Sequence, residues 1–368
     1  MPQRILHLIP FLWSGAGAVV TELCEHQARS ADITIVTSGR VRRQRDWPSY
    51  RRRLAQAGVR HATIDLFSRE SDIVWGSIDR LCGVVREFDP DVMHAHAGVP
   101  TAAALAARSL TGSRARVMAH MYSWGPGRPR WMDVMDLRAY ADADRILCSA
   151  RAYERTLVEG GVPARKLVYV PWGLPLDRLD AAAKTPGSHV PPTVGFVGRI
   201  EPRKGQLDLV RGFAHAHGRH PEARLELVGP VADEEYAGEI RRTVAKYKLE
   251  TSVRLTGRFR DVYPRMARWS LFVSLSRDEG QGLAVLEAMA LGVPVVALRV
   301  AGIEDFLDDF KTGRVVSSPS PRVVGSAIAE ALANPASLTA LAARARTMVH
   351  RRYGWNATLR TLERVYRT

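Results

Sequence analysis

Two glutamates at a fixed spacing are the residues of this sequence best suited to chemistry. Glu279 and Glu287 lie eight positions apart in DEGQGLAVLEAMALG, residues 278–292. Apart from Glu287, residues 283–291 are apolar, which predicts a buried helix that begins near Gly282 and ends before Gly292. A buried carboxylate is costly unless it has a partner. Ligand hydroxyls in a cleft or a buried basic side chain would satisfy Glu287, and the sequence leaves both open.

A second candidate site is cationic and suits a phosphate. The stretch VGFVGRIEPRKGQLDLVRGF, residues 194–213, predicts a strand, a turn and a helix. Free backbone N–H groups at the start of such a helix favour anions, and Arg199 and Lys204 flank the turn. Arginine can grip a phosphate with two hydrogen bonds, and lysine acts as a point charge. A solvated basic turn is the competing interpretation.

The N-terminal half carries weaker signals. Gly15 lies in WSGAGAVVTELCEH, a small-residue turn between the first predicted strand and the first predicted helix, where backbone could approach a phosphate or a sugar. His120 ends a predicted strand in RVMAHMYSWGPG, a position from which it could contact a ligand. His94 and His96 in DVMHAH read more simply as packing histidines.

The sequence predicts no metal site. Asp142 and Asp144 form an Asp-x-Asp, but it precedes a predicted strand and no partner carboxylate is evident. The three cysteines are far apart and form neither a Cys-x-x-Cys pair nor a cluster with histidine, which argues against zinc and fits a reducing compartment (Cys24, Cys82 and Cys148).

Short apolar runs alternate with stretches of 3.6-residue periodicity along the whole sequence. This order predicts parallel sheets with helices on both faces. It breaks at DAAAKTPGSHVPPT, residues 180–193, which we interpret as a linker. We therefore predict an α/β protein of two Rossmann-like, doubly wound domains facing a central cleft, where ligands would bind. The first covers residues 1–180, with helix 351–368 crossing back to it, and the second covers 181–350.

The formal net charge is +15, but it is spread over the sequence. Basic residues exceed acidic ones by 6 in residues 1–180 (25 against 19) and by 9 in residues 181–368 (28 against 19). Such a surface favours anionic ligands and does not by itself indicate nucleic acid, for which no recognised module is present. Salt-dependent binding to duplex would be needed to support a nucleic-acid partner.

These motifs, in this order, resemble the retaining glycosyltransferases of the GT-B fold, family 4. The segments that carry the resemblance are GRIEPRKG, the Glu-x7-Glu pair Glu279/Glu287, and EAMALGVPVVA. The resemblance implies transfer of a hexose-type sugar from a nucleotide-diphosphate sugar to a hydroxyl acceptor, with retention and without a metal. It implies no cofactor beyond the nucleotide sugar. The usual setting is bacterial polysaccharide, glycolipid or cell-envelope synthesis.

The resemblance also implies residue roles. Arg199 and Lys204 would grip the donor diphosphate, Glu279 would lie against the donor sugar, and Glu287 would hold the ribose hydroxyls. Backbone amides at the start of the helix would cap the diphosphate (Gly280, Gln281, Gly282 and Leu283). His120 would lie near the reacting sugar and Gly15 near the donor phosphates. The family's Pro-Asn-Gly appears here as Pro171-Trp172-Gly173, so Trp172 could be an acceptor contact or an interdomain contact.

Other functions compete with this interpretation. They are a nucleotide-sugar 2-epimerase on the same architecture, glycosylation of a soluble natural product, and a catalytically inactive sugar-nucleotide sensor. The segment GRVRRQRDWPSYRRR, residues 39–53, holds seven arginines with two aromatics among them. The arginines, Arg40 to Arg53, predict contact with an anionic membrane surface and a carbohydrate or lipid-linked acceptor, although a solvated loop is the simpler interpretation. We therefore expect a cytoplasmic protein, peripheral on the inner face of the membrane.

Overall fold

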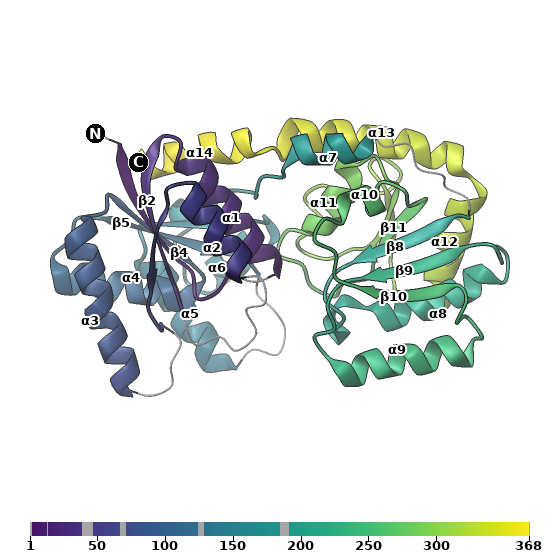
Figure 1. Ribbon diagram of the computed structural model, residues 1–368, viewed down its shortest axis with the longest axis horizontal. Coiled ribbons are helices and arrows are strands. Elements are labelled where there is room, and N and C mark those ends of the chain that lie inside the picture. The colour runs from purple at the N-terminus through teal and green to yellow at the C-terminus, as the bar shows by residue number, and fades with distance from the viewer. Residues whose placement is uncertain are drawn as a thin grey trace. The chain divides into compact units, whose positions relative to one another are not determined.

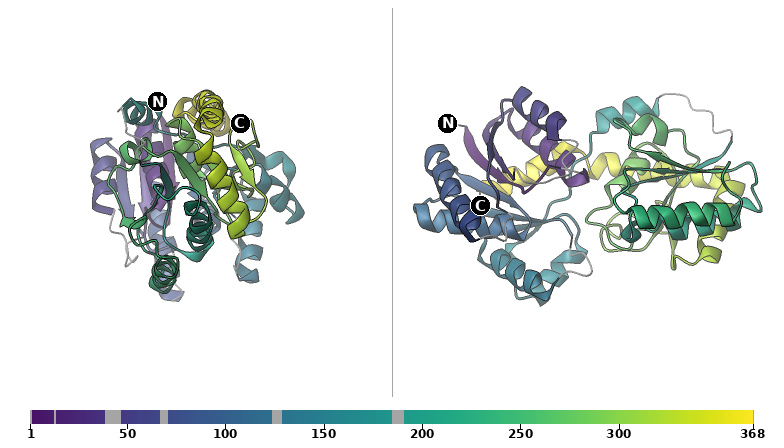
Figure 2. Two further views of the ribbon diagram at one scale, coloured as in Figure 1. Left: turned by 90° about the vertical axis from the view of Figure 1, so that its right-hand side faces the viewer. Right: turned by 60° about the horizontal axis from the view of Figure 1, so that its bottom comes forward.

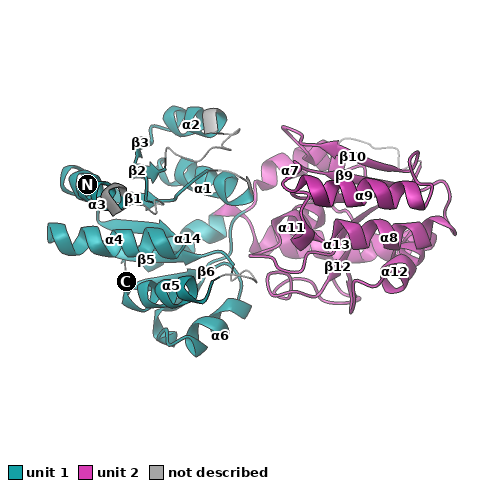
Figure 3. Cartoon of the chain, turned by 90° about the horizontal axis from the view of Figure 1, so that it is seen from below, with its two compact units in different colours: residues 1–173, 356–368 teal, residues 174–355 magenta. Residues whose placement is uncertain are grey.

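The computed structural model describes residues 2–12, 14–38, 47–66, 71–123, 129–184 and 191–367. The chain separates into two compact units (Figure 3). Unit 1 comprises residues 1–173 and 356–368, and unit 2 comprises residues 174–355.

Unit 1 contains a parallel sheet of seven described strands in the order β3-β2-β1-β4-β5-β6-β7 (Figure 1). The strands are β1 (Gln3–Leu8), β2 (Ala31–Thr37), β3 (Arg60–Thr63), β4 (Val92–His96), β5 (Arg116–Met121), β6 (Arg145–Cys148) and β7 (Leu167–Tyr169). The helices between them are α1 (Ser14–Gln27), α2 (Trp47–Gln56), α3 (Ser71–Phe88), α4 (Gly98–Thr111), α5 (Arg130–Asp142), α6 (Ala152–Glu159) and the 3-10 turn η1 (Ala164–Lys166). The apolar runs of the central strands form a sheet buried on both faces, as the sequence predicts.

Unit 2 repeats this plan with six described strands in the order β10-β9-β8-β11-β12-β13. The strands are β8 (Thr193–Val197), β9 (Arg224–Val228), β10 (Val253–Gly257), β11 (Leu271–Ser274), β12 (Val295–Leu298) and β13 (Arg314–Val316). The helices are α7 (Leu176–Ala183), η2 (Pro202–Lys204), α8 (Gln206–His217), α9 (Glu234–Lys246), α10 (Tyr263–Met266), α11 (Leu283–Ala290), α12 (Pro321–Ala333) and α13 (Pro335–Arg352). Helices lie on both sides of each sheet (Figures 1 and 2).

The boundary between the units differs from the predicted one at residue 180. Helix α7 already belongs to unit 2. Leu179 and Ala182 are buried in the core of that unit, and the Asp180 carboxylate accepts hydrogen bonds from Arg346 (2.6 Å) and His350 (2.9 Å) of α13. These contacts hold residues 176–183 against unit 2. Within the predicted linker, residues 185–190 lie outside the described residues.

The last helix, α14 (Trp355–Arg367), returns to unit 1 from Asn356 onward, as predicted for the C-terminal helix. Thr358 Oγ1 donates to the carbonyl oxygen of Pro171 (2.8 Å), and Arg116 donates to that of Tyr366 (2.8 Å). Leu362 and Tyr366 of its apolar face are buried. This helix therefore places a tyrosine hydroxyl inside unit 1.

None of the helices in the described ranges is long and apolar enough to cross a bilayer.

Candidate functional site

Two loops of unit 2 that are far apart in sequence are joined at the carboxyl ends of β8 and β11. Lys204 Nζ donates to Glu279 Oε1 at 2.6 Å. Next to this pair, Arg203 Nη1 donates to both the carboxylate and the carbonyl oxygen of Asp278, each at 3.0 Å. The Arg277 backbone N–H donates to the Arg203 carbonyl oxygen (2.9 Å). The cationic turn and the first glutamate, which the resemblance assigns to one donor, are therefore in direct contact.

Arg199 lies at the start of the same turn. Its guanidinium is 2.9 Å from Glu201 Oε1, and its carbonyl oxygen accepts from Gln206 Nε2 at 2.6 Å. The side chains of Arg199, Lys204 and Glu279 are 29%, 13% and 17% exposed. Each cation lies beside a glutamate, at a depth where water screens charge only in part.

Two glycines allow these loops to approach each other. Gly205 has a left-handed φ of 70° and is packed against the carbonyl oxygen of Leu275, where a side chain would collide. Gly302 is packed in the same way against the carbonyl oxygen of Glu279. A Cβ at either position would push the backbone of the Glu279 loop away, because backbone atoms cannot turn aside as a side chain can.

Helix α11 follows the Glu279 loop and begins after Gly282, as predicted. It is not buried all round. Leu283, Ala284 and Glu287 are only partly buried, and at spacings of one, three and four they share one face. Glu287 Oε1 accepts a hydrogen bond from the Tyr263 hydroxyl at 3.0 Å. Tyr263 is therefore a partner that the sequence did not reveal, since it lies 24 positions earlier in a different helix.

The start of α11 completes a surface suited to a phosphorylated ligand. Gly280 and Gln281 lie in the loop before the helix, and Gly282 caps it. Backbone N–H groups at a helix start, together with two cations, favour an anion such as a diphosphate. A half-buried carboxylate one turn further along suits ligand hydroxyls.

The two N-terminal candidates, Gly15 and His120, belong to unit 1. Gly15 is exposed in the first turn of α1, so the predicted loop is already helical there. His120 lies at the carboxyl end of β5 as predicted, but its side chain is fully buried. Its ring stacks on Trp172, with centroids 4.0 Å apart and planes 8° apart. Trp172 therefore makes a contact inside unit 1.

Four buried histidines form a cluster in unit 1, which we call the histidine cluster: His7, His94, His96 and His120. Strand pairing brings them together, because His7 is in register with His94 and His96 with His120. His7 Nδ1 lies 3.0 Å from His96 Nε2, and His94 Nε2 lies 3.2 Å from His120 Nδ1. The expectation that His94 and His96 merely pack is therefore incomplete.

Burial controls the charge of this cluster. Desolvation lowers the pKa of His120 to about 3, helped by repulsion from His7. Desolvation also lowers the pKa of His7 to about 4, although a hydrogen bond to Gln27 opposes it. The pKa values of His94 and His96 are held well below the usual range, by burial first and by the neighbouring histidines second. All four rings are neutral near pH 7.

Within the described ranges, one group has the spacing of metal ligands: His7, His94 and His96, with nitrogens within 4.8 Å of one another. In this group His7 Nδ1 and His96 Nε2 lie at hydrogen-bond distance from each other. The two carboxylates of the Asp-x-Asp make hydrogen bonds and ion pairs within unit 1. Asp144 binds Arg108 (2.6 Å) and the Val117 N–H (2.7 Å), and Asp142 pairs with Arg138 (3.0 Å).

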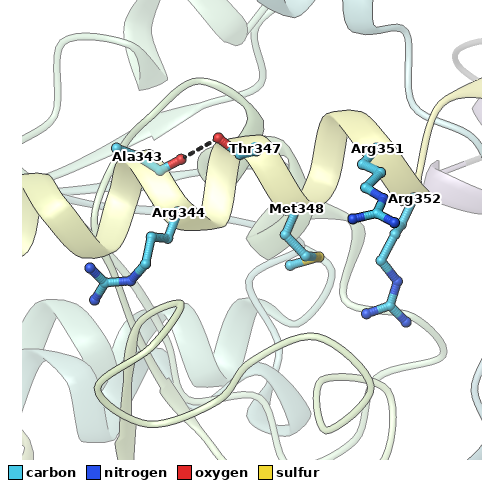
Figure 4. Close-up of a pocket in the computed structure, with 6 residues that line it drawn as sticks. All are labelled: Ala343, Arg344, Thr347, Met348, Arg351 and Arg352. Carbon is cyan, nitrogen blue, oxygen red and sulfur yellow. Dashed lines mark hydrogen bonds between the residues drawn. The ribbon is translucent and has the colours of Figure 1, made fainter.

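A hollow of about 460 Å³ lies along α13 in unit 2 (Figure 4). Arg344, Arg351 and Arg352 border it, and Arg344 is anchored on the carbonyl oxygens of Phe310 and Lys311 (3.3 and 2.9 Å). It shares no lining residue with the site around Lys204 and Glu279.

Comparison with known proteins gives matches to two family models. Residues 178–348 match "Glycosyl transferases group 1", and residues 14–173 match "Glycosyl transferase 4-like domain". Together they cover most of both units. The chain belongs to the GT-B glycosyltransferases of family 4. The candidate residues of unit 1 lie inside the second matched region, and those of unit 2 lie inside the first.

Curated relatives support this membership. D-inositol 3-phosphate glycosyltransferase 2 of Catenulispora acidiphila is 31% identical over 241 residues, which are 61% of this chain and 56% of that protein. The GDP-mannose-dependent alpha-(1-6)-phosphatidylinositol monomannoside mannosyltransferase of Mycobacterium tuberculosis is 29% identical over 300 residues, 75% of this chain and 76% of that one. The chain spans about half the length of the first curated relatives it matches.

The fold is that of solved GT-B structures. HepE of Anabaena, solved in complex with UDP and glucose, superimposes with a TM-score of 0.81 over 100% of both chains at 17% identity. The predicted fold of two Rossmann-like domains is therefore confirmed.

Replacing Lys204 with methionine keeps the aliphatic stem and removes the charge beside Glu279. One charged hydrogen bond contributes roughly 1.5–3 kcal/mol, so kcat/KM for a nucleotide-sugar donor should fall about 10- to 150-fold. Lys311→Met is the matched control, because Lys311 also pairs with a carboxylate of unit 2 (Asp308, 2.8 Å) but is largely exposed. Steady-state kinetics on both folded variants measure the difference. Equal kinetics for the Lys204 variant and the control would contradict the assignment.

The neutral histidine cluster predicts a steep loss of stability in mild acid. The folded pKa values lie below the unfolded value of about 6.5, so the unfolded chain takes up protons first as the pH falls. Between pH 6.5 and pH 4, each such histidine lowers the free energy of unfolding by up to roughly 1.4 kcal/mol for each pH unit of acidification. The four together lower it by up to about 5 kcal/mol per pH unit. Urea unfolding followed by fluorescence at pH 7.5, 6.5 and 5.5 measures this slope. An unfolding free energy that stays level below pH 6.5 would show that the cluster is charged in the folded state.

Proposed function

We propose that this protein transfers a hexose-type sugar from a nucleotide-diphosphate sugar to a hydroxyl acceptor, with retention of configuration. The observation that supports this most directly is the Lys204–Glu279 pair, which joins the cationic turn to the loop before α11 in unit 2. A group that binds a diphosphate and a group that can face a sugar are thereby neighbours. Family membership makes glycosyl transfer the natural use of this surface.

In the proposed mechanism, Arg199 and Lys204 bind the donor diphosphate and stabilise the negative charge that grows as it leaves. The N–H groups of residues 280–283 cap the same group. Glu279 lies against the sugar, and Glu287, already hydrogen-bonded to Tyr263, holds the ribose hydroxyls. The acceptor hydroxyl attacks from the face that the diphosphate leaves, and the departing phosphate takes its proton.

Each of the two cations at this site is balanced by a carboxylate. Glu201 offsets Arg199, and Glu279 offsets Lys204. A diphosphate brings negative charge to the same cations, so the glutamate at Lys204 is freed for a neutral partner such as a sugar hydroxyl. We propose that His120 and Gly15 of unit 1 face the same donor, and that unit 1 binds the acceptor.

The relatives suggest which donor and which acceptor to propose. The Mycobacterium tuberculosis relative uses GDP-mannose and a phosphatidylinositol mannoside by its name, and HepE was solved with UDP and glucose. We therefore propose a GDP- or UDP-sugar donor and a lipid-linked acceptor of the cell envelope. Incubation with donor alone separates the alternatives, because an epimerase would convert the donor without an acceptor, whereas a glycosyltransferase would not.

Substitution of Glu279 and of Glu287 should impair different steps of the reaction. Glu279→Gln should lower turnover at least tenfold while leaving or raising the affinity for free UDP or GDP, since it removes a negative charge beside the diphosphate site. Glu287→Gln should weaken nucleotide binding by roughly tenfold, because a charged hydrogen bond to the ribose is lost. Calorimetry with UDP and GDP on both variants tests this. The roles would be wrong if the Glu279 variant lost nucleotide binding and the Glu287 variant kept it.

We propose that no metal takes part, because cations and backbone N–H groups can carry the diphosphate charge. Excess EDTA should leave the transfer rate within about twofold. The assay is repeated after adding magnesium or manganese. A collapse that these ions restore would instead assign the diphosphate charge to a metal.

We also propose that unit 1 meets an anionic membrane, which would make the protein peripheral on the cytoplasmic face. On α2, Arg51 and Arg52 are exposed. Arg53 is not available for lipid, because it binds the Glu25 carboxylate with two hydrogen bonds (2.7 and 2.6 Å), and Tyr50 is buried. Arginines 40–45 lie outside the described residues. The described part of the predicted surface thus reduces to Arg51 and Arg52.

Arg51→Ser/Arg52→Ser should reduce co-sedimentation with vesicles of anionic phospholipid, since each arginine contributes on the order of 1 kcal/mol at low salt. The matched control is Arg241→Ser/Arg242→Ser, which removes two exposed charges from α9 of unit 2. Neutral vesicles should bind neither form. Equal losses in the two double variants, or no binding by the unaltered protein, would rule out this surface.

A further inference from the structure

The histidine cluster is part of a longer series of hydrogen bonds. We call it the histidine relay; in order it comprises Tyr122, His96, His7, Gln27, Tyr366, His94 and His120. The oxygen contacts are Tyr122 Oη to His96 Nδ1 (2.7 Å), His7 Nε2 to Gln27 Oε1 (2.8 Å), Gln27 Nε2 to Tyr366 Oη (3.2 Å) and Tyr366 Oη to His94 Nδ1 (2.6 Å). With the two contacts between rings, every inner nitrogen has a partner.

On the Tyr366 side of the relay, the hydrogen-bond donors and acceptors determine which ring nitrogen carries the proton. A neutral imidazole has one N–H and one bare nitrogen. The Gln27 amide N–H donates to Tyr366 Oη, and the buried tyrosine proton needs an acceptor, which His94 Nδ1 provides at 2.6 Å. His94 must then carry its proton on Nε2 and donate to His120 Nδ1. His120 therefore carries its own proton on Nε2.

On the Gln27 side of the relay, the partners of His7 and His96 also determine which ring nitrogen carries the proton. Gln27 Oε1 can only accept, so His7 carries its proton on Nε2 and leaves Nδ1 bare. His96 Nε2–H donates to that nitrogen, and His96 Nδ1 accepts from the Tyr122 hydroxyl. All four rings are neutral in this arrangement, as their complete burial requires.

The relay ends on an N–H whose acceptor is weak. His120 Nε2 lies 3.5 Å from Ser149 Oγ, the outer limit of a hydrogen bond. The Ser149 hydroxyl donates to the Met121 carbonyl oxygen (3.2 Å), so its oxygen faces His120 as an acceptor only. This contact independently supports a proton on His120 Nε2. A ligand oxygen at normal distance would be a better acceptor.

We propose that Tyr366 and His94 are positioning residues, which act through the relay to present the His120 Nε2–H as a neutral donor to an oxygen of the donor sugar. This inference rests on the proposed function, in which His120 faces that sugar. His120 lies beneath Trp172 and Tyr122 in this structure, so the ligand has to displace part of that cover. The C-terminal helix α14, which carries Tyr366, thereby sets the proton position of a residue on β5.

The relay can be tested without any ligand. Nitrogen NMR of the full-length protein, labelled with ¹⁵N-histidine and assigned by single His→Asn variants, should show His120 protonated at Nε2 alone. Tyr366→Phe removes the proton that fixes His94, so His120 should then show both tautomers. Thr358→Val is the matched control, because it also removes one buried hydroxyl of α14 but lies outside the relay. Nδ1-protonated His120 in the unaltered protein would overturn the inference.

The second readout is kinetic. Tyr366→Phe should lower kcat for transfer by roughly 2- to 12-fold, the value of one neutral hydrogen bond, while the affinity for UDP or GDP stays the same. In a His120→Asn background the Tyr366 change should add nothing further, because it acts through His120. Equal additive losses in both backgrounds, or the same loss in Thr358→Val, would show a merely structural role and overturn the proposal.

Two further outcomes are distinguishable. Zinc or another transition metal bound at one equivalent in the purified protein, and lost in His96→Asn, would make the rings metal ligands and overturn the relay. A relay with the expected tautomers in a protein that transfers no sugar would leave the ring arrangement intact, overturn the positioning role and count against the proposed function.

Discussion

The structure depends on one constraint: polar groups taken out of water inside a two-sided parallel sheet must find partners there. Each unit is built on such a sheet, so polar side chains at its centre cannot turn to solvent. In unit 2 the result is a set of ion pairs at the strand ends, with Lys204 on Glu279 and Arg203 on Asp278. In unit 1 it is a run of neutral rings and hydroxyls that partner one another.

The sequence predicts the features that rest on local patterns. The strands, helix α11 and the cationic turn at Arg199 and Lys204 follow from apolar runs, glycines and charge within about twenty residues, and each is present. Two local predictions are wrong for a local reason. Residues 180–183 are predicted to begin the linker but form the end of helix α7, because Leu179 and Ala182 pack into the core of unit 2. Gly15 is predicted to lie in a turn before the first helix, but it lies inside α1, because that helix begins at Ser14.

The contacts that define the sites depend on strand order and could not be read from the sequence. A single histidine in an apolar strand is more often a packed side chain than part of a network. His7, His94 and His120 become neighbours only because β1, β4 and β5 are adjacent in the sheet. Tyr366 joins them from 246 positions beyond His120 in sequence, through a helix that returns to unit 1. Tyr263 reaches Glu287 in the same non-local way. One signal was available: three predicted buried strands each carry a histidine near their carboxyl ends.

In the proposed reaction, unit 2 contributes charged groups and unit 1 contributes a neutral one. Unit 2 supplies fixed cations, which suit a leaving diphosphate. Unit 1 supplies His120 with a pKa of about 3, lowered by burial. A general base works best when its pKa lies near the pH of the reaction, so a ring with this pKa is a poor acceptor for the proton of an attacking hydroxyl. That proton has a better destination in the departing phosphate, which is basic and close to the acceptor in a same-face attack. His120 is then left with the one role that a neutral ring keeps at every physiological pH, which is to donate a hydrogen bond.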